Sequence, residues 1–422
     1  MARTAVVVGG GLLGVTSAWY LAERDFRVMV LERREATALD TSFANGGLIT
    51  PSQSDPWNGP GTALNLIKWL GRDDSPLLLR PGALPGMWRW GLKFLASSRM
   101  KHWWPATEAN LRLGLYSAAC LRELRGQLQL DYDHLDRGTL KLFRDEEALE
   151  HSDVLARSLA PLGLKHRVLD PGQAIEVEPL LAPLRDELAG AIHYPDDESG
   201  DAHRFTRLME DKAREAGVTF RFGAEVSGFR WRSDRIEALK CGAEELQADV
   251  CVLATASHTP ALAATLGLAL PIYPVKGYSL TLSVPDLKPA LSVPLVDFEQ
   301  KIVITPLGKR LRVAGTAEFA GFDNRENPRR SAGILKHTLR LLPQLAGRVE
   351  PADVLHWNGL RPMTADGPPI LGATRYSNLF LNTGHGPLGF THAAGSSRAV
   401  ADLVAGREPE IPLAGYSIAR FR

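Results

Sequence analysis

The first 32 residues constrain the fold of this chain more than any other stretch. Residues 4–8 are a short apolar run of β type, and residues 9–14 read Gly-Gly-Gly-Leu-Leu-Gly, which satisfies G-x-G-x-x-G. The motif permits a tight turn, a close approach of a pyrophosphate and a helix packed on the strand. A second apolar strand, 27–31, ends at Glu32, where a carboxylate would bond ribose hydroxyls. This frame predicts an ADP-containing dinucleotide, whereas the motif alone also fits a turn in an ordinary α/β protein.

Composition excludes several classes of partner. Forty-nine basic against 48 acidic residues leave a net charge of +1, so no overall field would recruit nucleic acid. The three cysteines have neither metal-ligand nor disulfide-framework spacing, and we expect no metal site. The first strand begins at residue 4, which leaves no room for a signal peptide, and no apolar run approaches the roughly 20 residues that span a bilayer. We therefore expect a cytoplasmic protein.

The order of predicted elements indicates an α/β fold with an α+β cap. Nucleotide-domain character recurs in a second block (helix 205–216, strand 218–222, hairpin 224–240, strand 249–254) and a third (strand 379–382, helix 395–405). The parts between them read as helices 110–128 and 331–342 and strands 138–143, 278–284, 301–305 and 310–315. We predict a Rossmann-like domain from 1–50, 196–269 and 353–422, and a mixed-sheet substrate domain from 51–195 and 270–352.

A second glycine-rich turn favours FAD over NAD. Residues 382–391 read Asn-Thr-Gly-His-Gly-Pro-Leu-Gly-Phe-Thr, in the order strand, turn, helix. Such a helix N-terminus can stabilise negative charge on a reduced flavin, and a nicotinamide enzyme has no need for it. The small-residue loop 41–49 also suits a flat ring, although each segment alone could be a connection without a cofactor. The expected cofactor-binding residues are Gly9, Gly11, Leu12, Leu13, Gly14, Glu32, Arg33, Ser42, Asn45, Gly46, Gly47, Leu48, Val226, Ala254, Thr255, Gly384, Gly386, Leu388, Gly389, Phe390 and Thr391.

At these motifs the chain resembles the superfamily of FAD-dependent D-amino-acid oxidases and glycine oxidases, and more closely the bacterial D-amino acid dehydrogenase (small subunit) family. The combination is specific to that family, whereas the N-terminal glycine motif is generic. The matching stretches span nearly the whole chain in order: Thr41-Ser42 with Ala44-Asn45, Ala63 to Trp69, Gly138-Thr139-Leu140 with Phe143-Arg144, and residues 195–201, 273–281, 359–364 and 382–386.

The resemblance implies oxidative deamination of D-amino acids to 2-oxo acids and ammonia, by hydride transfer from Cα to N5 of FAD. It also implies that the electrons pass to a quinone or another respiratory-chain acceptor. Loop 44–47 has no histidine and neither flavin loop has a cysteine, so we expect non-covalent FAD, because covalent members of the superfamily use such residues. One departure is Ala254-Thr255-Ala256, where the family usually has Ala-Thr-Gly.

Arg361, in Gly-Leu-Arg-Pro-Met-Thr, is the candidate for holding a substrate carboxylate, because a guanidinium matches two oxygens with a planar fork. The superfamily places its carboxylate-binding arginine in this motif; a surface or domain-pairing arginine is the alternative. Tyr273 and Tyr278 are candidates for bonding the same carboxylate or closing the pocket, and both could equally be core aromatics. His385 is expected beside the flavin or the substrate, unless its role is structural.

The stretch 64–104 mixes tryptophans with basic residues, and Gly86 to Leu95 could form a helix in a bilayer interface. In that interpretation the protein would bind peripherally to the inner face of the plasma membrane. The alternative interpretation is that the tryptophans pack inside the cap. The runner-up function is a related enzyme for glycine, sarcosine, D-proline or D-hydroxyproline. A 2-hydroxy-acid dehydrogenase and a flavin electron-transfer subunit of a heteromeric complex are further alternatives. The sequence leaves the side-chain preference, the acceptor and the oligomeric state open.

Overall fold

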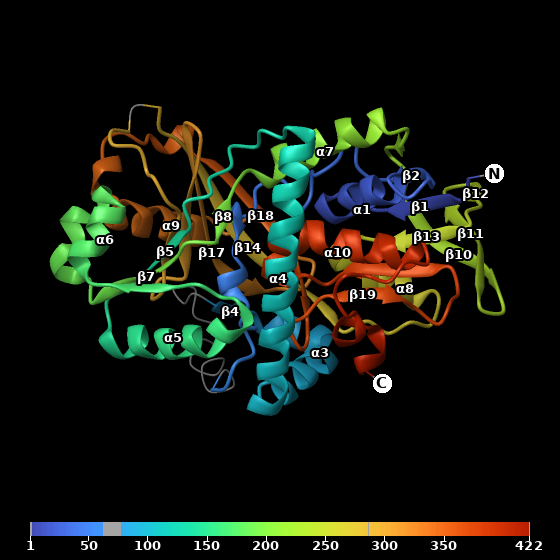
Figure 1. The fold of residues 1–422 in the computed structure, drawn as a ribbon, viewed down its shortest axis with the longest axis horizontal. Helices are drawn as coiled ribbons and strands as arrows, with labels where there is room; N and C mark the ends of the chain where they lie inside the picture. Colours follow the sequence, from blue (N-terminus) through green and yellow to red (C-terminus); the bar gives the residue numbers. More distant parts are fainter. Residues whose placement is uncertain (1, 62–76, 286, 422) are drawn as a thin grey trace.

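The computed structural model describes residues 2–61, 77–285 and 287–421, and its strands lie mainly in two sheets (Figure 1). The Ala63 to Trp69 match and the basic residues Lys68 and Arg72 lie outside the described residues. Within the described ranges, no helix is long and apolar enough to cross a membrane.

The smaller sheet is assembled from separated parts of the chain. All its strand pairs are parallel except that of the edge strand β19, and it includes both strands of the first 32 residues, at the predicted bounds. Its order is β19 (Ile370–Ala373), β20 (Leu379–Thr383), β13 (Val250–Leu253), β1 (Thr4–Val8), β2 (Arg27–Leu31) and β9 (Thr219–Arg221). Beside it lies a small sheet of β10 (Val226–Arg232), β11 (Arg235–Cys241) and β12 (Glu244–Leu246), which confirms the predicted hairpin.

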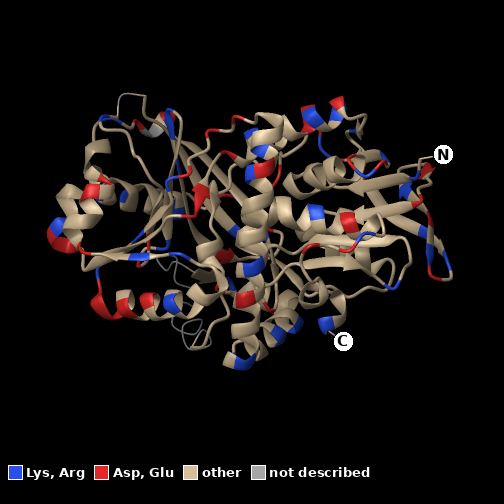
Figure 2. Ribbon diagram, in the orientation of Figure 1, with Lys and Arg blue, Asp and Glu red and all other residues tan. Residues whose placement is uncertain are grey.

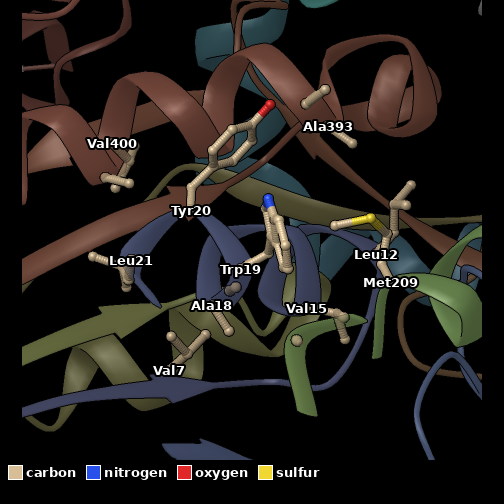
Figure 3. Close-up of a cluster of buried hydrophobic side chains, with 14 of the residues drawn as sticks. Val7, Leu12, Val15, Ala18, Trp19, Tyr20, Leu21, Met209, Ala393 and Val400 are labelled. Atoms are coloured by element: carbon tan, nitrogen blue, oxygen red, sulfur yellow. The ribbon is translucent and has the colours of Figure 1, made fainter. Parts of the chain in front are cut away.

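Helix α1 (Leu12–Ala22) is buried on nearly all sides. Figure 3 shows it between Val7 of the sheet, Met209 of α7 (Ala202–Glu215) and Ala393 and Val400 of α10 (Gly389–Val404). These side chains belong to one core cluster. Full burial of an apolar side chain contributes roughly 1.5–3 kcal/mol, so this stack fixes the position of the α1 N-terminus.

The larger sheet is mixed, and one of its faces packs against α9 (Pro328–Leu341). Its order is β18 (Leu355–Thr364), β14 (Ile272–Ser283), β17 (Arg310–Phe319), β16 (Ile302–Leu307), β15 (Leu295–Asp297), β5 (Thr139–Phe143), β7 (Gly190–Tyr194) and β6 (Arg167–Leu169), with β4 (Leu77–Leu79) on β17. Side chains alternate between the two faces along each strand. Along β14, Leu280 and Leu282 face the α9 side, whereas Ser279 faces the opposite side.

The remaining elements are α3 (Leu84–Ala96), α4 (Met100–Leu128), α5 (Glu146–Leu159), α6 (Pro171–Val177), α8 (Thr259–Ala264) and the pair β3 (Leu48–Ile49) and β8 (Glu198–Ser199). Helix α4 starts well before the predicted residue 110 and continues through Pro105, which normally marks a helix boundary. Strand β18 pairs with β14, so residues 355–364 belong to the larger sheet although the predicted division placed them with the nucleotide-binding part. The mixed α/β architecture confirms the predicted fold class.

Candidate active site

A cavity of about 600 Å³ lies at the carboxyl ends of β1, β2 and β13. The predicted cofactor residues that line it are Gly9, Gly11, Glu32, Arg33, Ser42, Val226, Ala254 and Thr255. Leu12, Leu13 and Gly14 form the adjoining start of α1. Ligands of open α/β sheets bind at this edge of the strands, so the cavity is the candidate nucleotide site.

The glycines of the first motif leave the room that a dinucleotide needs. Gly9 has φ +109°, and a Cβ there would lie 2.6 Å from the carbonyl oxygen of Ala254. A Cβ on Gly14 would overlap the carbonyl oxygen of Gly9, which is how closely α1 packs on β1. At Gly11 the nearest atom to such a Cβ is Oγ of Ser42, at the ordinary contact distance of 3.6 Å, so this position is less crowded than Gly9 and Gly14. The cradle therefore fits a pyrophosphate at the N-terminus of α1.

Backbone N–H groups hold the acidic residue of the motif in place. The N–H of Gly10 donates to Oε2 of Glu32 at 2.6 Å, and the N–H of Arg34 donates to Oε1 at 2.8 Å. Across the cavity mouth, the N–H of Leu12 donates to Oγ of Ser42 at 3.2 Å. The carboxylate is thus fixed where the sequence placed a ribose contact.

Several residues that line the cavity were not singled out from the sequence. Arg33 pairs with Asp40 at 2.7 Å, and its Nη2 lies 3.0 Å from Nε2 of His258. Burial and the charge of Arg33 lower the pKa of His258, so its imidazole is neutral at neutral pH. No sequence motif indicates Asp40 or His258, because His258 is distant from Arg33 and Asp40 in the sequence and comes close to them only in the folded chain.

Hydrogen bonds fix loop 41–48 on the larger sheet. The loop carbonyls of Ala44, Asn45 and Gly46 accept from Ser279, Arg312 and Thr305, at 2.6, 2.9 and 2.6 Å. The Asn45 side chain accepts from the N–H of Gly47, which has φ +69°, and Leu48 pairs with Ser199. Residues 44–48 are therefore held in place through their own backbone and, unlike Thr41 and Ser42, do not line the nucleotide cavity.

The second glycine turn packs against β18. Gly384 and Gly386 have φ +80° and +54°, and Cβ atoms there would lie 2.7 Å from Thr364 and 2.8 Å from Met363. Helix α10 then begins at Gly389 with no side-chain cap and no acidic residue in its first turn. Its N–H groups and positive dipole end are available to an anionic ring atom.

Around that turn, Leu388 and Phe390 are buried, and Oγ1 of Thr391 accepts from the N–H of Thr50 at 2.9 Å. Nε2 of His385 lies 3.1 Å from Oγ of Ser396, and Nε2 of His392 donates to the carbonyl of Asn110. Burial depresses the pKa of His385 well below its usual value and lowers that of His392 to about 4. Both imidazoles are therefore neutral at neutral pH.

Among the described residues, Arg361 has no carboxylate partner. Within the same part of the chain, its guanidinium forms one hydrogen bond, from Nη1 to the carbonyl of Thr316 at 3.3 Å, and lies 5.6 Å from the ring centre of Trp57. Burial lowers its pKa to about 10, which still leaves it charged at neutral pH. A buried guanidinium without a carboxylate partner is suited to receive one from a ligand.

The two candidate tyrosines lie on opposite faces of β14. Tyr273 is on the face of Arg361 and packs against Trp90 and Phe319, at 5.4 and 6.3 Å between ring centres. Tyr278 lies on the α9 face, where its hydroxyl donates to Glu318. The structure therefore brings Tyr273 together with Arg361 and separates Tyr278 from both.

Strand β18 connects the predicted flavin loops to Arg361. Just before Arg361, the carbonyl of Leu360 accepts from the hydroxyl of Thr41 at 2.9 Å; just after it, Met363 forms a bridge with His385. The carboxylate candidate thus lies between the two loops expected to hold a flavin. This arrangement can place an anionic substrate beside a bound ring.

Known proteins share this organisation along the whole chain. The sequence model of the family "FAD dependent oxidoreductase" matches residues 4–403. The chain is 45% identical over 419 residues to a D-amino acid dehydrogenase of Paramagnetospirillum magneticum, covering 99% of this chain and 98% of that protein. It is 43% identical over 418 residues to one of Methylobacterium radiotolerans, covering 99% of each.

Solved structures have the same fold. A glycine oxidase from Geobacillus kaustophilus superposes with a TM-score of 0.76 at 25% identity, over 99% of each chain. An L-proline dehydrogenase from P. horikoshii superposes with a TM-score of 0.79 at 20% identity, over 100% of this chain and 98% of that one. The predicted cofactor class is confirmed, and the glycine cradle and uncapped helix N-termini fit it. This chain belongs to the family of FAD-dependent oxidoreductases.

Proposed function

We propose that this protein is a D-amino acid dehydrogenase that converts D-amino acids to 2-oxo acids and ammonia and passes the electrons to a respiratory-chain acceptor. The observation that carries this proposal is Arg361, a partly buried guanidinium without a carboxylate partner among the described residues, beside both flavin loops. Relatives named D-amino acid dehydrogenase, at 40–45% identity along nearly the whole chain, support the stereochemistry.

When bound, non-covalent FAD would supply the acceptor for the hydride that leaves the substrate Cα, and the imino acid product would be hydrolysed in water. The residues of this chain supply position and charge. Gly9, Gly11 and Gly14 with Glu32 would hold the ADP part, whereas loop 42–48 and the first turn of α10 would hold the ring. Arg361 binds the substrate carboxylate and thereby fixes where the Cα–H bond points. Trp57 borders that guanidinium, and Tyr273 lies on the same face of the sheet.

The histidines make poor bases in this arrangement. His385 and His392 are buried, and burial depresses the pKa of both, so neither readily holds a proton at neutral pH. Since the substrate amine must lose its extra proton before hydride transfer, we infer that this proton leaves to solvent. We assign His385 a positioning role, through its bridge to Met363 in β18.

The test is anaerobic reduction of the FAD-loaded protein, followed by the loss of absorbance near 450 nm. The panel contains D- and L-amino acids, glycine, sarcosine and D-proline. Rapid bleaching by D-amino acids alone supports the proposal. Bleaching by glycine, sarcosine or D-proline instead would favour the runner-up amine enzyme, and bleaching by none would favour a hydroxy-acid substrate or an electron-transfer subunit.

We further propose that the acceptor is a membrane quinone and that α3 lies on the membrane surface. Residues 77–104 contain five Arg or Lys and no acidic residue. Along α3, one stripe (Met87, Trp90, Phe94) is buried in the cap, and a second stripe is exposed: Leu84, Trp88, Leu92 and Leu95, with Trp88 at 55% and Leu92 at 62% exposure. Figure 2 shows basic segments on α3 and on the start of α4. An apolar stripe edged by basic residues fits an anionic lipid surface.

Sedimentation with vesicles tests this contact. We expect the protein to bind phosphatidylglycerol vesicles, with high salt weakening the binding, and phosphatidylcholine vesicles less. Trp88→Glu should lower the bound fraction about tenfold or more, whereas Trp231→Glu, at a 46% exposed site on β10, should not. Equal binding by both variants would refute the role of α3. Concentration-dependent dimerisation lost only in Trp88→Glu would instead identify the stripe as a contact between copies.

A further inference from the structure

Two glycines lie directly opposite each other at one end of the larger sheet, Gly277 on β14 and Gly359 on β18, the first strand in the sheet order. Both are on the face of Arg361. A Cβ on Gly277 would lie 2.5 Å from Nη2 of Arg361 and closer still to its Cζ and Nη1. A Cβ on Gly359 would lie 2.9 Å from Cζ3 of Trp357 and closer to Cη2. The space that two side chains would fill is therefore taken by a guanidinium and an indole.

The backbone gives no reason for a glycine at position 277. The residue lies in a regular strand and is not among those with positive φ. Glycine in a strand interior is unfavourable, by roughly 0.5–1 kcal/mol relative to alanine in regular structure, and often marks a close approach. Here the group that approaches the strand is the guanidinium of Arg361, which explains why position 277 has no side chain.

The neighbouring strand bends at the same place. The register of β14 and β17 shifts between Gly277 and Tyr278, which leaves Thr316 as an extra residue with φ +57°. Its carbonyl accepts the hydrogen bond from Nη1 of Arg361, and its Oγ1 is buried without a hydrogen-bond partner among the described residues. A residue other than glycine in this region of φ costs energy, and such strain gathers at functional sites. The bulge thus turns a carbonyl towards the guanidinium.

We propose that Gly277, with the Thr316 bulge, is a positioning residue that seats Arg361 for the substrate carboxylate. This inference rests on the proposed function. Arg361 has no counter-charge among the described side chains that would fix its position. The space above Gly277, here called the seat, and the carbonyl of Thr316 therefore determine how the guanidinium is oriented. A methyl group at position 277 must displace the guanidinium. The sheet itself should be preserved, because the displaced atoms are the far end of a flexible side chain.

The test combines Gly277→Ala and Arg361→Leu, alone and together, in the FAD-loaded protein. Anaerobic stopped-flow reduction gives the Kd and limiting rate for a D-amino acid and for the corresponding D-amino amide. Gly277→Ala should raise the Kd of the acid on the order of 10- to 100-fold, with a smaller change in limiting rate and little change for the amide. In the Arg361→Leu background the same substitution should add nothing, because the leucine does not reach the seat. Gly228→Ala, on β10 with nothing within 4 Å of the added Cβ, is the matched control.

The outcomes separate this inference from the proposed function. If Arg361→Leu weakens acid binding but Gly277→Ala matches the wild type, the seat is refuted and the carboxylate role of Arg361 stands. If Arg361→Leu has no effect, the proposed role of Arg361 fails. If Gly277→Ala fails to fold only when Arg361 is present, the clash with the guanidinium is supported. If it fails to fold in both backgrounds, Gly277 serves the sheet and the inference is overturned.

Discussion

Replacing Arg361 with leucine should weaken substrate binding by an amount that follows from its surroundings. Among the described residues the guanidinium has one hydrogen bond, to a carbonyl, and burial lowers its pKa to about 10. The positive charge is therefore maintained without a carboxylate partner among the described residues. A substrate carboxylate bound by both of its oxygens would offset the cost of holding this charge away from water. Hydrogen bonds between charged groups contribute about 1.5–3 kcal/mol. Because Arg361 keeps some solvent contact, we take about 1.5–3 kcal/mol for the whole carboxylate interaction rather than for each of its two bonds, which corresponds to a Kd raised about 12- to 150-fold.

The assay is the anaerobic reductive half-reaction, in which the Kd and the limiting rate are obtained separately. The variant should retain FAD, since Arg361 does not line the nucleotide cavity. Its Kd for a D-amino acid should rise while its Kd for the D-amino amide, which lacks the carboxylate, stays near the wild-type value. Arg230→Leu, which removes an exposed ion pair on β10, serves as the control.

The reasoning would be refuted if Arg361→Leu bound the acid as tightly as the wild type. It would also be refuted if acid and amide lost affinity equally, because the guanidinium would then act on the shape of the pocket rather than on the carboxylate.

Two further predictions concern the cradle and the buried histidines. Gly14→Ala places a methyl group on the carbonyl oxygen of Gly9, so the 450 nm absorbance per protein and the midpoint temperature of unfolding should both fall. The control is Gly126→Ala in α4, where the added methyl group has free space. This variant should keep FAD, and its free energy of unfolding should rise by up to about 1 kcal/mol. Retained FAD in Gly14→Ala would contradict the close packing of α1 on β1. Burial lowers the pKa of His392 to about 4, below the ordinary 6.5. As pH falls, the unfolded chain therefore takes up a proton at this residue before the folded chain does. The free energy of unfolding should decrease by about 3 kcal/mol from this residue between pH 6.5 and 4. Urea unfolding across this range should show a shallower slope for His392→Phe, and an unchanged slope would count against a buried neutral imidazole.

Local sequence was enough to predict the elements that form the candidate nucleotide site. Strands 4–8 and 27–31 occur at their predicted bounds, and the glycine motif lies between them at the start of α1. Here the signal is short-range: apolar runs, glycines at fixed spacing and one acid lie within 32 residues, and each acts on its immediate neighbours. The family, the cofactor and the fold class were accessible for the same reason, since the motifs follow one another along the chain.

The same patterns misjudged elements whose limits depend on packing. Helix α10 begins at Gly389 instead of 395, and α4 continues through Pro105, because burial against distant segments offsets poor local propensity. The face of the sheet on which Tyr278 lies could not be predicted from the residue type. Which face faces the site depends on how β14 pairs with β17 and β18, and not on the residues next to Tyr278 in the sequence.

The sequence by itself thus determined the kind of cofactor and the arginine expected to meet the substrate. Only the tertiary structure decided what surrounds that arginine. Gly277, Thr316 and Trp57 are 84, 45 and 304 positions from Arg361 in the chain, and no spacing relates them. They meet because β18 pairs with β14, β17 bulges beside it and the 51–57 segment folds over the sheet. Contacts between strands distant in sequence are set by the burial of whole sheets, which no local pattern records.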